Sequence, residues 1–159
     1  MSATNIYDLA IIFPCYNEAR RVGQTMAAYR DYLFNHQQLS QQTVALVFVD
    51  DGSTDQTRSI LTEAAGQPSA NLSIQVVHYP INRGKGGAIK AGVEAVEAKN
   101  YGFVDADLAY GPELVPLMLA KLDDSDLVLA QRQPSKEASL YQRWRNFLSG
   151  SLQAVANYL

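Results

Sequence analysis

Five short runs of apolar residues recur along the chain, and Pro, Asp, Gly or Asn residues bound them. Each run is four to six residues long and most are rich in β-branched side chains, which suits a buried strand better than a helix. The pattern therefore predicts five strands, at Leu9–Phe13, Val44–Val49, Ser73–His78, Tyr101–Val104 and Asp126–Ala130.

Longer stretches with helical character separate these runs, at Arg21–Phe34, Thr54–Ala65, Gly86–Lys99 and Pro112–Leu122. Thr54 is placed to cap the second of these helices, and Pro112 suits the first turn of the fourth. Strands that alternate with helices predict an α/β fold, in which helices cover both faces of a mainly parallel sheet. The chain has no internal repeat and no low-complexity linker, so we expect one domain over residues 1–159.

The last segment, residues 139–159, has a different pattern, because its apolar residues recur every three or four positions. They form one stripe on an amphipathic helix, made of Tyr141, Trp144, Leu148, Leu152, Val155 and Leu159. The stripe is still running at the last residue, without a cap or a stop signal. Such a helix can pack on the domain itself, on a second copy in a homo-oligomer, or in a membrane interface, where Trp and Tyr favour the headgroup level.

The composition is that of a globular protein, with 159 residues of which 47% are hydrophobic and 18% charged. No apolar run approaches the roughly 18–20 residues needed to cross a bilayer, and no signal peptide is visible. Cys15 is the single cysteine, which excludes an internal disulfide and favours the cytoplasm. His36 and His78 lack partners at zinc-ligand spacing.

The net charge of −3 conceals an asymmetry between the body of the chain and its end. Residues 1–130 carry nine Lys or Arg against fifteen Asp or Glu, whereas residues 131–159 carry four basic residues against one acidic residue. An acidic body argues against nucleic acid as a partner, because nucleic-acid binding needs a broad basic face. The basic end is consistent with an anionic ligand, a membrane surface or a solvated helix face.

Polar residues follow each of the first four predicted strands. In an open α/β sheet, ligands bind at the carboxyl ends of the strands, so these residues are expected to gather at one edge. The four segments are Pro14-Cys15-Tyr16-Asn17-Glu18, Asp50-Asp51-Gly52-Ser53-Thr54-Asp55, Asn82-Arg83-Gly84-Lys85-Gly86-Gly87 and Asp105-Ala106-Asp107.

Asp105 and Asp107 are two residues apart, so in extended backbone their carboxylates project from the same side. Directly after an apolar strand, such a pair is costly unless a cation neutralises it. Mg²⁺ or Mn²⁺ suits the pair, because it accepts one or two carboxylates and leaves its other positions to water and phosphate oxygens. An isolated Asp-x-Asp is more often a turn or a cap, and the preceding strand and the glycine loop favour the metal interpretation here.

The glycine-rich segment matches neither of the two best-known phosphate loops. A Walker loop needs Gly at position 79 and Ser or Thr at position 86, which are Tyr79 and Gly86, and the dinucleotide pattern needs Gly or Ala where Ile89 stands. What remains is a flexible basic loop that enters a helix and can approach a phosphate, or else a simple tight turn.

Asp50 and Asp51 exceed what the cap of the following helix requires, whereas Asp55 is well explained by capping. Ionised carboxylates accept hydrogen bonds, so Asp50 or Asp51 could bind the N–H of a nucleobase or a ribose hydroxyl. Tyr16 could lie against a base, and Glu18 could bind the ribose or pair with a neighbouring arginine.

Together, "IIFPCYNEARRV", "VFVDDGSTDQT", "NRGKGGAIKAGV" and "FVDADLAYGPE" resemble a family-2 glycosyltransferase of the GT-A fold, over residues 9–115. Within that family, "DADLAYGPE" and the arginine-containing tail resemble the dolichyl- or polyprenyl-phosphate glucosyl- and mannosyltransferases. The resemblance implies that residues 6–132 bind the nucleotide. It also implies inverting transfer of a hexose from UDP-glucose or GDP-mannose to a polyprenyl or dolichyl phosphate, with Mg²⁺ or Mn²⁺ on the diphosphate.

The resemblance also assigns roles to individual residues. Those around the nucleoside and its phosphates are Pro14, Tyr16, Glu18, Asp50, Asp51, Asn82 and Lys85. The metal ligands are Asp105 and Asp107. "LAQR" places Arg132 on a phosphate-binding arginine, and "RNFLS" places Arg145 and Ser149 near the acceptor phosphate.

The chain departs from the family pattern in two respects. Where some relatives supply a third metal ligand, Ala109 offers only its backbone. Family members also continue with further strands and often membrane helices, so we expect the fold to be truncated at its C-terminus. The expected location is the cytoplasm, either free or peripheral at the cytoplasmic face of the membrane.

The expected chemistry is displacement at the anomeric carbon, with Asp107, Arg132 and Arg145 in the catalytic machinery and positive charge stabilising the leaving diphosphate. A lipid phosphate needs no general base, since its second pKa is about 6, whereas a glycan hydroxyl needs one. Three alternatives remain: a nucleotide-sugar-binding domain without catalysis, transfer to a glycan hydroxyl, and a nucleotidyltransferase, which the loop after the first strand disfavours.

Overall fold

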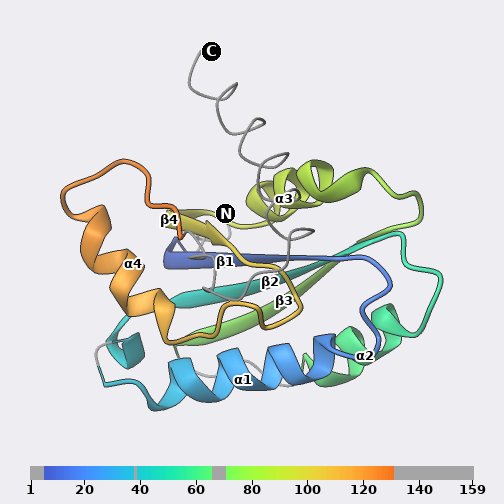
Figure 1. The fold of residues 1–159 in the computed structure, drawn as a ribbon, viewed down its shortest axis with the longest axis horizontal. Coiled ribbons are helices and arrows are strands. Elements are labelled where there is room, and N and C mark those ends of the chain that lie inside the picture. The colour runs from blue at the N-terminus through green and yellow to red at the C-terminus, as the bar shows by residue number, and fades with distance from the viewer. Residues whose placement is uncertain (1–5, 38, 66–70, 131–159) are drawn as a thin grey trace, which may run out of the picture. The chain divides into compact units, whose positions relative to one another are not determined.

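The computed structural model describes residues 6–37, 39–65 and 71–130. Strands and helices alternate along them, in the order β1 (Tyr7–Cys15), α1 (Val22–Asn35), β2 (Val44–Asp51), α2 (Thr57–Ala64), β3 (Leu72–Tyr79), α3 (Gly84–Ala95), β4 (Ala98–Phe103) and α4 (Leu114–Leu122), with a short 3-10 helix η1 (Leu39–Gln41) before β2 (Figure 1). The predicted α/β class is therefore confirmed.

The four strands form one parallel sheet in the order β3-β2-β1-β4. The chain builds outward from β1 to β3 and then returns through α3 to place β4 on the other side of β1. Such a reversal of direction leaves a crevice beyond the carboxyl ends of β1 and β4, where ligands of open α/β sheets bind. The fold thus places its switch point between β1 and β4.

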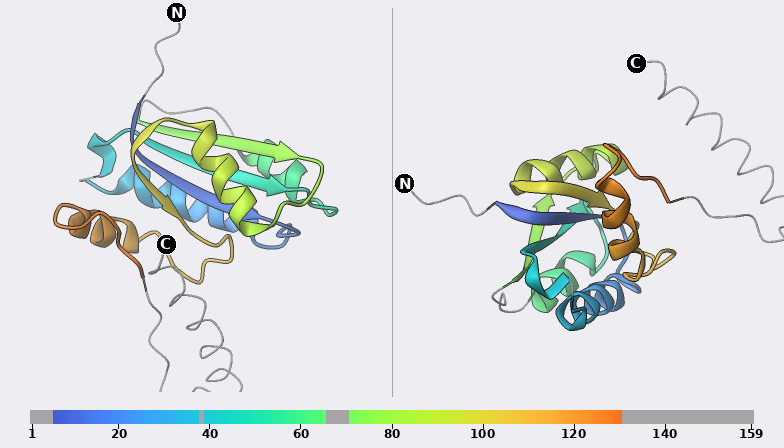
Figure 2. Two further views of the ribbon diagram at one scale, coloured as in Figure 1. Left: turned by 90° about the horizontal axis from the view of Figure 1, so that it is seen from above. Right: turned by 90° about the vertical axis from the view of Figure 1, so that its left-hand side faces the viewer.

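The sheet is covered on both faces (Figures 1 and 2). On one face, α1 and α2 pack over β1 and β2, where Phe13 stacks on Phe48 with ring centroids 4.5 Å apart. On the other face, α3 lies so close that a Cβ at Gly92 would come within 2.6 Å of Ile12. β2 is buried along its whole length, as expected of a central parallel strand.

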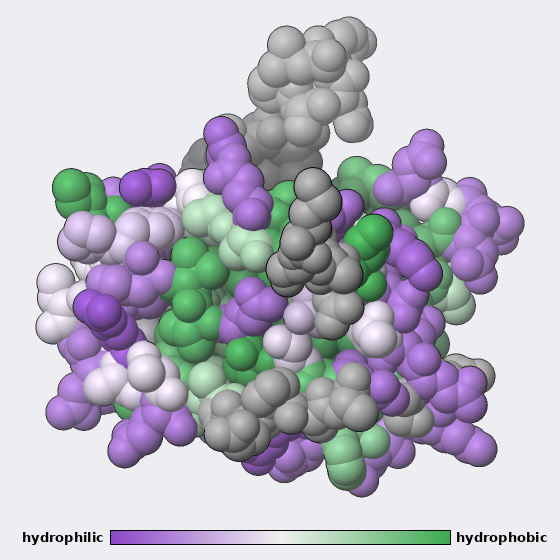
Figure 3. All heavy atoms as spheres, turned by 180° about the vertical axis from the view of Figure 1, so that it is seen from behind, coloured by the Kyte–Doolittle hydropathy of each residue, from purple (hydrophilic) through white to green (hydrophobic). Residues whose placement is uncertain are grey.

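β3 is an edge strand of the described sheet, and its six central residues are half-buried. Figure 3 shows this side of the molecule, with apolar side chains gathered near the middle and hydrophilic side chains around them. Among the described residues, no helix is long and apolar enough to cross a membrane.

Several predicted element boundaries differ from those of the structure. The second helix begins at Thr57 rather than after Thr54, with Gln56 at the N-cap position, and Asp55 Oδ1 accepts the backbone N–H of Thr57 at 2.9 Å. The third helix ends at Ala95 instead of Lys99, since the chain from Ala98 onward pairs with β1, starting from Tyr7. Pro112 lies in a turn just before α4.

The predicted fifth strand, Asp126–Ala130, was also wrong. These residues form no ladder in the part of the chain that the structure describes, and Leu127 and Leu129 are exposed. An apolar run becomes a strand only when another strand pairs with its backbone, which the sequence of the run cannot provide.

The chain divides into compact units at residues 1–120 and 121–159, and the prediction of a single domain stays a prediction. The predicted helix at 139–159 lies outside the described residues.

Candidate functional site

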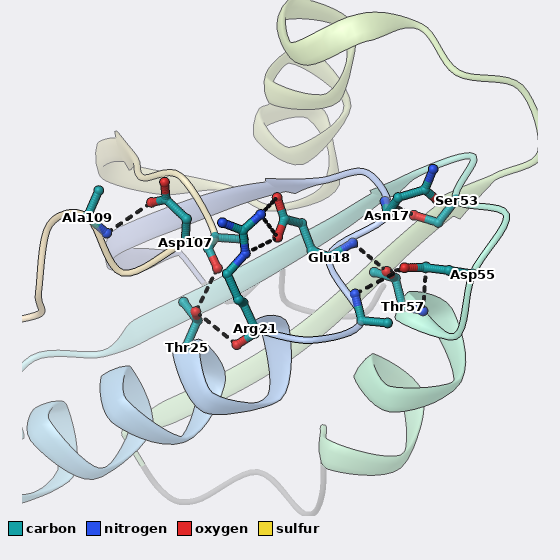
Figure 4. Close-up of polar contacts among 11 residues, drawn as sticks. Asn17, Glu18, Arg21, Thr25, Ser53, Asp55, Thr57, Asp107 and Ala109 are labelled. Carbon is teal, nitrogen blue, oxygen red and sulfur yellow. Dashed lines mark hydrogen bonds and ion pairs between the residues drawn. The ribbon is translucent and has the colours of Figure 1, made fainter. Parts of the chain in front are cut away.

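The loop after β1 is fastened to the loop after β2 by hydrogen bonds through side chains (Figure 4). The backbone N–H of Asn17 donates to Ser53 Oγ at 3.0 Å, and Asn17 Oδ1 accepts the N–H of Thr54 at 2.9 Å. Asn17 has a φ of 55°, a left-handed conformation that asparagine tolerates better than most residues. The backbone N–H of Glu18 donates to Thr57 Oγ1 at 2.8 Å. These contacts hold the two loops in one arrangement at the carboxyl edge of the sheet.

Asp55 joins the same contact set from the loop after β2. Its carboxylate accepts the N–H groups of Thr57 and, at 3.2 Å, Ala19. Burial raises the pKa of Asp55, but the hydrogen bonds from Thr57 and Ala19 outweigh it and leave the pKa below its ordinary value. Asp55 therefore serves as an ionised structural acceptor, as the capping interpretation predicted.

Glu18 forms a bidentate ion pair with Arg21, with Arg21 Nε at 2.8 Å and Nη2 at 3.1 Å from its carboxylate oxygens. In Figure 4 this pair lies between Asp107 on one side and the cluster of Asn17, Ser53 and Asp55 on the other. Of the alternatives that the sequence left open for Glu18, the structure shows the pairing with an arginine. Pro14, near the end of strand β1, is half-buried, whereas Tyr16 is 48% exposed.

The two adjacent carboxylates at the end of β2 are both buried, and the protein satisfies both. Asp50 is completely buried; its Oδ2 lies 2.8 Å from His78 Nδ1, and its Oδ1 accepts the N–H of Ser53. Asp51 Oδ1 accepts the N–H of Arg83 at 2.7 Å. Asp50 is thus a buried residue that supports the loop after β2. Asp51 connects the end of β2 to the loop after β3.

The loop after β3 lies against the loop after β2. A Cβ at Gly52 would come within 2.8 Å of the backbone nitrogen of Asn82, and Gly52 has a φ of 70° that disfavours other residues. Asn82 is exposed, and its Oδ1 accepts the N–H of Gly84 at 3.0 Å. This loop brings the first turn of α3, with Lys85, to the edge of the sheet.

Lys85 extends from α3 to the end of β4. Its Nζ forms an ion pair with Asp105 Oδ1, and it lies 5.5 Å from the centroid of the Phe103 ring. Both charged side chains are about half exposed, at 52% and 50%. The glycine-rich segment and the Asp-x-Asp motif, separated in the sequence, thus meet through their charged groups.

The turn that carries Asp105 and Asp107 is anchored to α1 from below. Thr25 Oγ1 donates to the carbonyl oxygen of Ala106 at 2.7 Å. Asp107 is exposed, and its Oδ1 accepts the N–H of Ala109 at 2.9 Å. Because the backbone turns at Ala106 and Asp107, the extended geometry predicted for the two carboxylates was wrong, although both are exposed at the switch point.

Asp105 and Asp107 fit a cation that needs few protein ligands. Among the described residues there is no group of three or more His, Cys, Asp or Glu side chains that could hold a metal ion. Two exposed carboxylates are the donor set expected for Mg²⁺ or Mn²⁺ that keeps water and phosphate oxygens as its other ligands. Ala109 offers only its backbone, and its N–H donates to Asp107 Oδ1.

Comparison with protein families matches residues 10–156 to Glycosyl transferase family 2. The chain belongs to this family. The match covers the loops after all four strands, so the resemblance seen in the sequence motifs is confirmed.

Similar proteins of this family include transferases named for polyprenyl phosphates. The undecaprenyl-phosphate 4-deoxy-4-formamido-L-arabinose transferase of Photorhabdus laumondii is 30% identical over 147 residues, which cover 90% of this chain and 42% of the relative. The dodecaprenyl-phosphate galacturonate synthase of Rhizobium johnstonii is 25% identical over 154 residues, with 93% and 44% covered. The chain therefore spans less than half the length of these relatives.

Solved structures of glycosyltransferases show the same fold. A mannosyltransferase from Pyrobaculum calidifontis, in complex with GDP-Man and Mn²⁺, matches with a TM-score of 0.65 and 23% identity over 82% of this chain and 37% of that one. Glucosyl-3-phosphoglycerate synthase from Mycobacterium tuberculosis, with Mn²⁺ and UDP-glucose, matches with a TM-score of 0.57 and 20% identity, covering 76% and 40%. These likenesses confirm the GT-A fold.

Sequence reasoning missed residues that hold the site of this family-2 chain together. They include Thr25, His78 and Arg83, whereas Arg21 was among the partners expected for Glu18; the guanidinium of Arg83 lies 4.3 Å from the centroid of the Tyr79 ring. For His78, the sequence did carry a signal, because a polar residue stands there at the end of an apolar predicted strand. Thr25 gave none, because its partner is 81 residues away. Arg132, Arg145 and Ser149 lie outside the described residues and stay predictions.

Proposed function

We propose that this chain binds a nucleoside-diphosphate sugar at the β1–β4 switch point and transfers the sugar, with inversion, to a polyprenyl phosphate. The observation that carries the proposal is the meeting of Lys85 with Asp105 beside Asp107 at this crevice, in a chain of glycosyl transferase family 2. An exposed pair of carboxylates and a lysine supply the two kinds of charge that a metal diphosphate requires.

The nucleoside part of the donor is assigned to the fastened loops after β1 and β2. Tyr16 is exposed enough to lie against a base, with Pro14 and Glu18 next to it. Asp51, at 3% exposure, is the better of the two carboxylates for hydrogen bonding to the base, since Asp50 is wholly buried and both its oxygens are held, by His78 and Ser53. In this proposal Asp50 supports the site from within, and Asn82 lines it from the loop after β3.

The diphosphate part is assigned to Asp105, Asp107 and Lys85. Asp105 and Asp107 would hold Mg²⁺ or Mn²⁺, which, when bound, stabilises negative charge on the leaving diphosphate. Lys85 adds a positive charge on the same side, where charge accumulates during displacement. Two of the solved structures with this fold contain a nucleotide sugar together with Mn²⁺, which supports the assignment.

The acceptor is proposed to be a lipid phosphate. Two relatives are named for undecaprenyl and dodecaprenyl phosphate, respectively. A phosphate oxygen is already ionised near neutral pH and attacks without a general base. Arg132 and Arg145 would bind the phosphates near the acceptor, and the basic end of the chain would favour a peripheral position at the cytoplasmic membrane face.

The test is a calorimetric titration of the chain with UDP and with GDP, each with and without Mn²⁺. Metal-dependent binding of one nucleotide and not the other supports the donor site and identifies the base. UDP-glucose and GDP-mannose are then assayed for turnover with a polyprenyl phosphate, alongside other sugars on the same nucleotide. If neither nucleotide binds with Mn²⁺, the proposed donor site is wrong.

A second candidate is a nucleotide-sugar-binding unit without turnover. It requires only the residues proposed for the donor, which lie at or just after the carboxyl ends of β1, β2, β3 and β4. Metal-dependent nucleotide binding without transfer to a polyprenyl phosphate or a glycan hydroxyl would support this candidate.

A further inference from the structure

The Asp105 carboxylate has two competing partners, which are Lys85, with which it forms an ion pair, and the proposed cation. Asp105 Oδ1 is held by the ammonium group of Lys85. The same carboxylate is one of the two exposed acidic side chains that would hold the cation, and a divalent ion near it would also repel the lysine. With Asp105 as a cation ligand, the lysine's contact with Oδ1 therefore has to weaken or break.

The surroundings allow Lys85 to leave Asp105. Both side chains are half exposed, so the ammonium group can be rehydrated and ion pairing in water is weak. Lys85 also lies in the first turn of α3, between Gly84 and Gly86, where a Cβ would meet nothing within 4 Å and a phosphate can come close to the backbone. A bound diphosphate would offer the lysine new negative charge.

We propose that Lys85 is an exchangeable counter-ion, which neutralises Asp105 in the free protein and transfers to the donor diphosphate when cation and nucleotide bind together. This inference rests on the proposed function for the identity of the ligands. It adds that the protein itself disfavours the cation alone. Lys85 thereby couples the binding of the two ligands, because the nucleotide draws Lys85 away from Asp105 and so removes its competition with the cation.

The coupling has a defined sign. Without nucleotide, Lys85 lowers the affinity for the cation; with nucleotide, it loses this effect and binds the diphosphate. Because binding free energies are reciprocal, the cation must raise nucleotide affinity by the same factor as the nucleotide raises cation affinity. Removal of the Lys85 charge should reduce that factor, whether it is measured as the effect of nucleotide on cation affinity or as the effect of cation on nucleotide affinity.

The experiment measures Mn²⁺ binding to the full chain by the electron paramagnetic resonance signal of free Mn²⁺, without nucleotide and at saturating UDP or GDP. The variants are Lys85→Met, Lys85→Arg and Lys90→Met. Lys90 is the matched control, since it lies on the same helix, is exposed, and pairs with Glu94. Circular dichroism and thermal unfolding show that each variant is folded.

Lys85→Met is expected to bind Mn²⁺ alone about three- to tenfold more tightly than the unaltered chain, as expected for loss of a half-exposed ion pair and of a nearby like charge. Lys85→Arg should restore the weak binding, and Lys90→Met should leave it unchanged. The nucleotide should enhance Mn²⁺ affinity less in Lys85→Met than in the unaltered chain.

The inference is overturned if Lys85→Met binds Mn²⁺ alone no more tightly than the unaltered chain, or if Lys90→Met gains as much. The proposed function is tested separately by nucleotide binding to the unaltered chain. If the unaltered chain binds no nucleotide but Lys85→Met binds Mn²⁺ more tightly, the donor site is rejected. The competition between Lys85 and the cation is then retained.

Discussion

Thr25 Oγ1 donates a hydrogen bond of 2.7 Å to the carbonyl oxygen of Ala106, the residue between the two carboxylates at the end of β4. Thr25 is completely buried in α1, and the contact joins positions 81 residues apart. A second contact, from Tyr29 Oη to the carbonyl oxygen of Tyr110 at 3.1 Å, connects the same helix to the following loop. Helix α1 is therefore the support of the proposed metal-binding turn.

Thr25→Val should loosen this turn without altering the shape of the core. The variant leaves the Ala106 carbonyl without its donor, at an expected cost of about 1–2 kcal/mol in the free energy of unfolding. Mn²⁺-dependent nucleotide binding, measured by calorimetry, should weaken in parallel. Thr62→Val is the control, because Thr62 donates to its own helix on the exposed side of α2. Equal effects of the two substitutions would contradict the supporting role of Thr25.

Asp107→Ala should abolish metal-dependent nucleotide binding and leave the fold intact. Asp107 is exposed, and its carboxylate accepts one hydrogen bond, from the N–H of Ala109. Little stability therefore depends on this carboxylate. Calorimetry with UDP and GDP in the presence of Mn²⁺ measures the loss, and circular dichroism checks the fold. Asp31→Ala, which removes an exposed carboxylate on α1, is the control. Unchanged nucleotide affinity in Asp107→Ala would rule out Asp107 as a metal ligand.

His78→Ala should destabilise the protein although His78 lies outside the proposed contacts with the donor. The substitution leaves one oxygen of the buried Asp50 carboxylate without its partner, which costs about 1–3 kcal/mol. Urea unfolding measures this loss. In the Asp50→Asn background, the cost of His78→Ala should be smaller, because a neutral amide loses less than a carboxylate. Additive losses would show that the two residues are not coupled.

Acid should weaken the amino-terminal end of the sheet through Asp8. Hydrogen bonds from Lys99, in β4, and from Thr43, just before β2, lower the pKa of Asp8 to about 2. A carboxyl whose pKa is lower in the folded than in the unfolded state adds stability above its unfolded pKa of about 4. That contribution is lost as the pH falls through about 4 toward 2.

The Asp8→Asn variant isolates this contribution. Its free energy of unfolding in urea should fall less than that of the unaltered chain between pH 6 and pH 3. Lys99→Met should reduce the same pH dependence by removing the first of the groups that lower the pKa. An identical pH dependence in the unaltered chain and in Asp8→Asn would show that Asp8 does not control the acid response.

The sequence by itself determined the α/β class, four of the strands and the four loops that meet at the carboxyl edge of the sheet. These features follow from local information: apolar runs of strand length, and polar or glycine residues where each run ends. The family was likewise carried by the motifs at those four loops. That Asp55 serves the start of the second helix was also a local inference: its carboxylate accepts the N–H of Thr57, although Gln56 occupies the N-cap position.

Only the tertiary structure decided which partner each polar residue has. Asp50 and Asp51 are neighbours of the same type and both are buried, yet the register of β2 against β3 sets Asp50 beside His78, whereas Asp51 accepts the N–H of Arg83. The crossover through α3 brings Lys85 to Asp105, and the absence of a ladder in the described residues leaves Asp126–Ala130 without strand structure. Pairing partners, unlike strand or turn propensity, belong to distant segments, so no pattern within one segment can specify them.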